Sequence, residues 1–244
     1  MDQLIKELAT KARKAGRHLA ASDYSTRVNA VLAIADELVQ RKAEILAANE
    51  RDIAKARESG MVESLIDRLL LTSERIDGIA NAARKVSRLP DPLQQTLRER
   101  TLENGLHLRQ VSVPFGVIGM IYEARPNVTV DAAVILLMSG NAALLRGSAS
   151  ASESNSVLIT IMKDALSTTT ISPEVIQLVP SDDRNSVTAL LHARGSIDLV
   201  IPRGSAALIR MVVDEARVPT IETGAGVCHV YFDESADEKM AIPI

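Results

Sequence analysis

The sequence contains few of the residues that mark metal, disulfide or membrane chemistry. Cys228 is the single cysteine among 244 residues, so no intrachain disulfide can form, and a reducing cytoplasm is the expected location. The four histidines lack the spacing of zinc ligands, so we expect no metal site. No apolar run is long enough to span a bilayer, and residues 1–20 lack the continuous apolar core of a secretory signal. We therefore expect no membrane partner.

Aromatic residues and excess positive charge are also scarce. The chain has three tyrosines, two phenylalanines and no tryptophan, and its formal net charge is -3. A nucleic-acid-binding surface needs basic side chains that follow the phosphates, and often aromatic rings on which bases stack. The composition therefore argues against nucleic acid and favours a small-molecule substrate.

Residues 1–104 have the apolar spacing of amphipathic helices. Apolar side chains recur every three or four positions, which places them on one face of a helix. The clearest stripe comprises Val28, Val31, Ile34, Ala35 and Leu38. Gly60 is expected to end one helix, and Ser73 is expected to be the N-cap of another. We interpret this part as a structural helical region that packs on the rest of the chain.

Residues 105–244 show a different pattern, in which short apolar runs alternate with helical segments. Residues 106–113 alternate apolar and polar side chains, which predicts a half-exposed strand or hairpin arm. The remaining runs predict a doubly wound, mainly parallel α/β sheet of Rossmann-like type, because alternating strands and helices form right-handed crossovers. The predicted strands are 116–121, 142–147, 175–180, 198–202 and a buried strand at 227–232.

The ends of these strands are the expected ligand sites, because open parallel sheets bind ligands at the carboxyl ends of their strands. One predicted strand ends in Arg146, Gly147 and Ser148, and another ends in Pro202, Arg203, Gly204 and Ser205. A glycine followed by an N-capping serine leaves free backbone N–H groups at a helix N-terminus, which suits a phosphate. The alternative is an ordinary strand-to-helix turn. Neither a GxGxxG fingerprint nor a P-loop follows any predicted strand.

Several motifs resemble the aldehyde dehydrogenase superfamily. Residues 113–133 resemble the segment in which a strand leads into a Pro-Asn loop, and four motifs resemble the glutamyl-5-phosphate reductase branch in the same order. These motifs are 121–131, 144–147, 201–204 and 224–235. The resemblance implies an aldehyde-dehydrogenase-type fold and an NADPH-dependent reduction of L-glutamyl 5-phosphate to L-glutamate 5-semialdehyde in proline biosynthesis.

The resemblance also implies roles for residues after the first parallel strand. Asn127 takes the place of the asparagine whose side chain donates to the developing oxyanion. Without the resemblance, capping of the loop after Pro126 would be the favoured interpretation. Glu123 and Arg125 belong to the same motif and are assigned to substrate binding, since a guanidinium can hold a carboxylate or phosphate in a bidentate grip. The alternative is a surface pair between the two side chains.

For the cofactor, the resemblance places Arg146 beside the adenosine ribose. Ala149 replaces a glutamate of NAD-preferring relatives, so NADP(H) is the expected cofactor because repulsion of a 2′-phosphate is absent. The alternative is a solvent-facing arginine at a strand end. The expected cofactor-binding residues are Arg146, Gly147, Ser148, Pro202, Arg203, Gly204, Ser205, Thr223 and Gly224.

The nucleophilic cysteine of the resembled enzymes has no counterpart in this sequence. Cys228 is expected to be a packing residue of the predicted strand, and Glu222 is not assigned to catalysis. We therefore expect the catalytic domain to be absent and the polypeptide alone to lack reductase activity. The alternative function is a non-catalytic dinucleotide-binding or remnant domain. A homo-oligomer, or self-association through the surface left by the missing domain, is the expected assembly.

Overall fold

The computed structural model describes residues 1–183, 185–222, 227 and 229–241. Five helices come first in the chain, in agreement with the helical spacing of that region. They are α1 (Asp2–Ala21), α2 (Tyr24–Gln40), α3 (Lys42–Glu58), α4 (Glu63–Leu69) and α5 (Ser73–Val86). Gly60 follows the end of α3 with a φ of 74°, as expected for a glycine after a helix. The N-cap of α5 is Thr72 and not Ser73, because the Thr72 side chain accepts the hydrogen bond from the Arg75 N–H.

A parallel sheet of four strands forms the centre of the molecule. Its strands occur in the order β5-β4-β3-β6, and every neighbouring pair is parallel. The strands are β3 (Val117–Tyr122), β4 (Ala142–Arg146), β5 (Ile176–Leu178) and β6 (Leu199–Arg203). The connecting and following helices are α6 (Pro126–Met138), α7 (Ser152–Ser167), α8 (Asn185–His192) and α9 (Ala206–Glu215), with 3-10 turns at Ala149–Ala151 and Pro173–Val175. The chain order reverses after β5, so β3 and β6 become neighbours, as in a doubly wound sheet.

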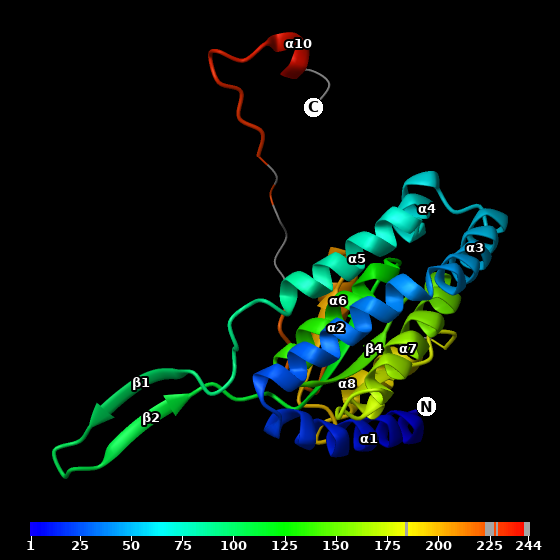
Figure 1. Cartoon of the computed structure of the whole chain (residues 1–244). Coiled ribbons are helices and arrows are strands. Elements are labelled where there is room, and N and C mark those ends of the chain that lie inside the picture. Colours follow the sequence, from blue (N-terminus) through cyan, green and yellow to red (C-terminus); the bar gives the residue numbers. More distant parts are fainter. Residues whose placement is uncertain (184, 223–226, 228, 242–244) are drawn as a thin grey trace.

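Helices cover both faces of this sheet (Figure 1). On one face, Ile118 and Tyr122 of β3 belong to a core shared with α2, α5, α6 and α7. On the other face, Val117 and Ile121 belong to a core shared with α1, α8 and α9. Successive strand side chains point to opposite faces, so an almost wholly apolar strand can serve both cores. The expected doubly wound α/β fold is therefore confirmed, and α1 itself covers one face of the sheet.

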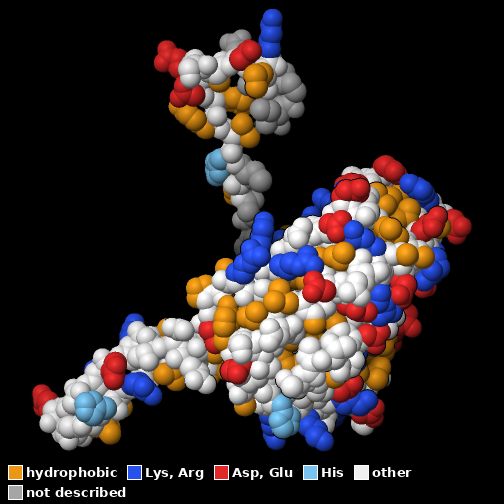
Figure 2. Space-filling view, in the orientation of Figure 1, with side chains coloured by type: hydrophobic (Ala, Val, Ile, Leu, Met, Phe, Trp, Pro, Cys, Tyr) orange, Lys and Arg blue, Asp and Glu red, His pale blue; other side chains and the backbone are white. Residues whose placement is uncertain are grey.

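A two-stranded antiparallel hairpin projects from the body (Figure 1). Its strands are β1 (Thr96–Thr101) and β2 (His107–Val111), and all of their residues are exposed. The predicted boundary at residue 105 falls in the turn between these strands, where Gly105 has a φ of 83°. Apolar, acidic and basic side chains lie along the hairpin surface (Figure 2).

The buried strand predicted at 227–232 is wrong for the residues that the structure describes. Val227 and residues 229–232 have no strand conformation, and Val230, Tyr231 and Phe232 are exposed. Apolar alternation gives a strand only where a neighbour supplies hydrogen-bond partners. The chain leaves the edge of β6 after Thr220 forms an isolated bridge with Val200, and α10 (Glu238–Ala241) follows later. Cys228 lies outside the described residues.

None of the described helices combines the length and apolar character of a membrane-spanning segment.

Candidate cofactor and substrate site

The predicted site residues meet at the carboxyl edge of the sheet. In the register of the strands, Arg146 of β4 lies beside Ile121 of β3, and Arg203 of β6 lies beside Tyr122 of β3. One strand therefore separates the two arginines, and the loop after β3 emerges between them. This edge is where an open parallel sheet binds its ligands.

The loop after β3 becomes α6, with Arg125 as N-cap and Pro126 in the first turn. Pro126 is suited to this place because its missing N–H would have no partner within the helix. The Asn127 amide nitrogen donates to the carboxylate of Asp131 at 3.0 Å, one turn further along the helix. Burial raises the pKa of Asp131, while the hydrogen bond from Asn127 acts in the opposite direction. The two half-buried side chains therefore hold each other in a fixed arrangement.

Glu123 reaches the N-terminus of α9. Its carboxylate accepts hydrogen bonds from the Ser205 backbone N–H at 2.9 Å and from the Ser205 hydroxyl at 2.6 Å. Ser205 is also the N-cap of α9, which confirms the expected capping role. A side chain on Gly204 would come within 2.6 Å of the Glu123 carboxyl carbon, so a glycine permits this approach. An anionic group thus occupies the helix N-terminus where the sequence suggested a phosphate.

The end of β4 holds the second group of predicted cofactor residues. Arg146 donates to the Ser186 hydroxyl at 3.2 Å and to the Ser181 carbonyl at 3.3 Å, so its guanidinium does not simply face solvent. Gly147 is buried, and a Cβ there would collide with the Asn155 amide and the Tyr122 ring. Ser148 caps the short turn that follows.

Three cavities lie along this edge. The first, of about 400 Å³, is lined in part by Asn127, Asp131 and Arg125. The second, of about 260 Å³, is lined by Glu123, Arg125 and the 203–205 turn, among others. The third, of about 280 Å³, lies beyond Gly147 and is lined in part by Ala149, Ser181 and Asp182. Arg146 and the 203–205 turn therefore share an edge of the sheet and do not line a common cavity.

The helical region contributes to these cavities, which the sequence analysis missed. Arg68 of α4 and Arg75 of α5 line the first cavity, and Arg68 also lines the second. Helical periodicity identifies core faces, and it carries no information about which exposed side chain faces a distant loop. The excess of arginine over lysine around 68–75 was the available signal.

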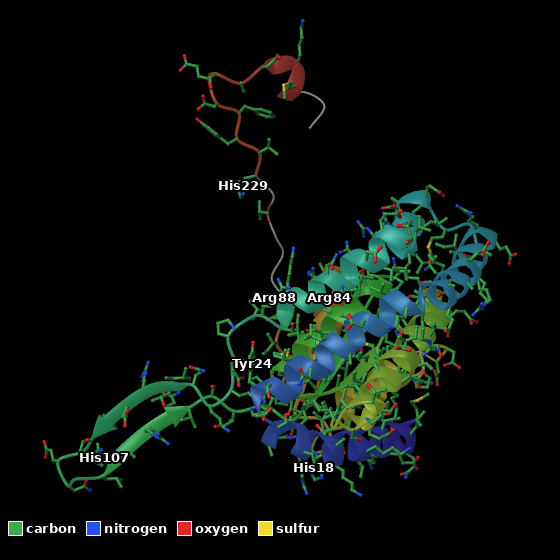
Figure 3. The ribbon with its side chains drawn as sticks, viewed as in Figure 1. His18, Tyr24, Arg84, Arg88, His107 and His229 are labelled. Atoms are coloured by element: carbon green, nitrogen blue, oxygen red, sulfur yellow. The ribbon has the colours of Figure 1, made fainter. Side chains whose placement is uncertain are left out.

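Some of the predicted residues line none of the three cavities or lie outside the described part of the chain. Thr223 and Gly224 lie outside the described residues, and Glu222 is exposed. Pro202 is a buried member of β6. In the described part of the chain, no group of three or more His, Cys, Asp or Glu side chains is placed to hold a metal ion. His18 lies on α1, His107 lies on β2 and His229 lies outside the helices and strands, and the three are far apart in Figure 3.

The model of the aldehyde dehydrogenase family matches residues 2–243. The chain belongs to this family. Enzymes of the aldehyde dehydrogenase family are oxidoreductases that act on aldehyde groups and use a nicotinamide dinucleotide. The family assignment agrees with the helices and parallel sheet described above and with the motifs at 113–133.

Relatives within the aldehyde dehydrogenase family include gamma-glutamyl phosphate reductases. The one from Thermobifida fusca (strain YX) is 51% identical over 240 residues, which are 98% of this chain and 57% of that protein. The Thermotoga maritima crystal structure superposes with a TM-score of 0.89 at 42% identity, covering 98% of this chain and 58% of that one. The Saccharomyces cerevisiae crystal structure superposes with a TM-score of 0.82 at 33% identity, covering 88% of this chain and 54% of that one. The chain spans just over half the length of these relatives.

Proposed function

We propose that this chain carries the dinucleotide site and part of the acyl-substrate site of a reductase that converts L-glutamyl 5-phosphate to L-glutamate 5-semialdehyde with NADPH. One observation carries the proposal: the Arg125–Asn127 turn emerges at the carboxyl edge between the ends of β4 and β6. The names of the relatives in Thermobifida and Thermotoga support the choice of substrate. Residues 105–244 form the proposed dinucleotide domain, with residues 1–104 packed on it.

The residues at the strand ends fit a dinucleotide. The N-terminus of α9 holds the carboxylate of Glu123, so Ser205 has the donors that an anionic phosphate needs. Gly147 and Asn155 both line the third cavity, and the close packing of Asn155 against Gly147 leaves no room for a side chain at this position. NADPH, when bound, supplies the hydride. We assign Arg146, Gly147, Ser148, Pro202, Arg203, Gly204, Ser205, Thr223 and Gly224 to holding it.

The preference for NADPH over NADH is proposed to come from Arg146. Its guanidinium donates to the Ser186 hydroxyl and to the carbonyl of Ser181, a residue that lines the third cavity, so its charge can attract a 2′-phosphate bound there. Ala149 lines the same cavity and brings no carboxylate. Asp182 also lines it, so the preference depends on the balance between one arginine and one aspartate.

The acyl group is proposed to bind in the first cavity, beside Asn127. An amide NH₂ has two donors, and Asp131 accepts one of them. The other can donate to the acyl oxygen as charge develops on it, and such a donor is typically worth about 3 kcal/mol in the transition state. Asp131 is then a positioning residue, because it fixes the orientation of the amide. Arg125 and Glu123 complete the proposed substrate-binding set.

A homo-oligomer, or self-association through the surface left by a missing domain, is the proposed assembly, and the hairpin is a further surface that a second copy could cover. An isolated two-stranded hairpin is marginally stable in water, and this one exposes apolar side chains on its surface. The exposed apolar residues are Leu97, Leu106, Leu108 and Val111, with relative exposures of 60%, 53%, 37% and 40%. A second copy of the chain that covers them would stabilise the hairpin. The single cysteine is compatible with the proposed action in a reducing cytoplasm.

The proposed function is tested by titrating the protein with NADPH and with NADH, following the nicotinamide fluorescence. We expect saturable binding of both, with NADPH bound more tightly. Absence of saturable NADPH binding would contradict the proposal. A parallel turnover assay with L-glutamyl 5-phosphate and NADPH shows whether this chain itself completes the reaction.

A further inference from the structure

Two arginines from distant parts of the sequence lie at the junction of the first and second cavities. Arg68 comes from α4, in the helical region, and Arg125 comes from the loop between β3 and α6. Both residues line both cavities. The two cavities therefore share two arginine residues, which come from two separate elements.

Neither guanidinium is neutralised within the described part of the chain. No hydrogen bond or ion pair of the Arg68 or Arg125 side chain to a described residue is present in the structure, and both residues are exposed. Arg75, which lines the first cavity with them, differs in this respect. It donates to Asp67 at 2.7 Å and to the Leu70 carbonyl at 2.8 Å.

The carboxylates that line these cavities have other partners. Asp67 is paired with Arg75, Glu123 is held by Ser205, and Asp131 accepts from Asn127. The pKa of Asp131 is also raised by burial, which lowers its tendency to carry charge. Positive charge at the junction is thus left without a partner among these acids, which favours binding of an anion.

We propose that Arg68 is a substrate-binding residue that acts together with Arg125 to hold an anionic group of the acyl substrate, either a carboxylate or a phosphoryl group. Carboxylates and phosphates share the oxygen spacing that a guanidinium fork contacts through two N–H groups. Identifying the anion as part of an acyl substrate rests on the proposed function. The helical region then determines substrate specificity in addition to its structural role.

The position of Asn127 favours an acyl substrate over an isolated ion. Asn127 lines the first cavity, two residues after Arg125. A short acyl chain with its reacting carbon beside the Asn127 amide would extend from the first cavity toward the two guanidinium groups. A substrate with anionic groups at both ends, such as an acyl phosphate of a dicarboxylic acid, matches this arrangement.

The test is an NMR titration of the isotope-labelled protein, residues 1–244, with L-glutamate and separately with inorganic phosphate. Backbone amide and arginine Nε–H signals report binding, and the dissociation constants are compared for the wild type, Arg68→Ala and Arg68→Lys. The control is Arg88→Ala, which removes an exposed arginine near the C-terminal end of α5 that lines neither cavity (Figure 3). Thermal unfolding of each variant checks that the exposed substitution leaves the fold intact.

We expect Arg68→Ala to weaken the binding of at least one of the two anions roughly tenfold. The affinity of Arg68→Lys should be intermediate, and that of Arg88→Ala should equal the wild type. Loss of glutamate binding alone assigns a carboxylate to Arg68, and loss of phosphate binding alone assigns a phosphoryl group. The inference is overturned if neither anion binds the wild type, or if Arg68→Ala and Arg88→Ala behave alike.

NADPH binding by the same samples separates this inference from the proposed function. Loss of anion binding in Arg68→Ala with unchanged NADPH affinity supports both the anion site and the proposed function. If the wild type does not bind NADPH but Arg68 still controls anion affinity, the proposed function fails and the anion site stands. If NADPH binds and Arg68 has no effect on either anion, the inference alone fails.

Discussion

The carboxylate of Glu123 is bound by the backbone N–H and the hydroxyl of Ser205, at 2.9 and 2.6 Å. This contact joins the end of β3 to the start of α9, two elements that are 82 residues apart in the chain. It places an acidic group at the positive end of a helix, where a ligand phosphate is proposed to bind. Glu123 and a phosphate would therefore compete for the same donors.

Glu123→Ala is expected to strengthen NADPH binding by about two- to fivefold, because removing one nearby negative charge relieves repulsion of order 1 kcal/mol or less at the surface. Fluorescence titration with NADPH measures the change. Glu215→Ala, at the opposite end of α9, is the matched control and should have no effect. Weaker NADPH binding in Glu123→Ala would mean that Glu123 supports the cofactor and does not compete with it.

Arg146→Ala is expected to weaken NADPH binding roughly tenfold while changing NADH binding less than about twofold, because a charged contact to the 2′-phosphate is lost. Arg146→Lys should lie between the wild type and the alanine variant, since it keeps the charge and loses the planar fork. Because Arg146 also donates to Ser181 and Ser186, urea unfolding is measured alongside. Equal losses for NADPH and NADH would remove this account of cofactor choice.

Gly147→Ala is expected to destabilise the fold by about 1–3 kcal/mol, because its Cβ has no room between Asn155 and Tyr122. Tyr122 cannot easily move, since its hydroxyl is hydrogen-bonded to Thr129 at 2.7 Å in the core. Gly78→Ala provides a contrasting control: no atom lies within 4 Å of the new Cβ, and the site is inside α5. The free energy of unfolding of Gly78→Ala should rise by about 0.5–1 kcal/mol. Similar urea midpoints for the two variants would contradict the crowding at Gly147.

Asp131 should contribute a pH dependence to stability. Burial raises its folded-state pKa above the ordinary value of 3.8, so the folded protein binds more protons than the unfolded chain between these two values. This contribution to the free energy of unfolding therefore falls as pH rises through that window, and it is constant at higher pH. Asp131→Asn removes the titration and can still accept from Asn127.

The expected result is that the stability of Asp131→Asn relative to the wild type increases from pH 3.8 upward and then levels off. Urea unfolding across the acid range measures the difference. A difference that is independent of pH would show that the Asp131 carboxyl titrates alike in the folded and unfolded chains.

The sequence by itself determined the helical first part, the parallel sheet and the Ser205 cap. Apolar periodicity and capping chemistry are local signals, so they are visible without knowing which elements meet. The strand expected at 227–232 shows the limit of such signals, because a strand also needs a neighbour to pair with, and Val230 is exposed.

Tertiary structure alone decided which side chains meet at the carboxyl edge. The Glu123 carboxylate accepts a hydrogen bond from Ser205 and does not pair with the Arg125 side chain. Arg146 donates to Ser181 and Ser186, and Arg68 lines two cavities. These contacts join residues that are 35 to 82 positions apart. Their geometry depends on the order of strands in the sheet and on how α4 packs against α3 and the segments that follow β3 and β4, and neither is encoded in the spacing of any one segment.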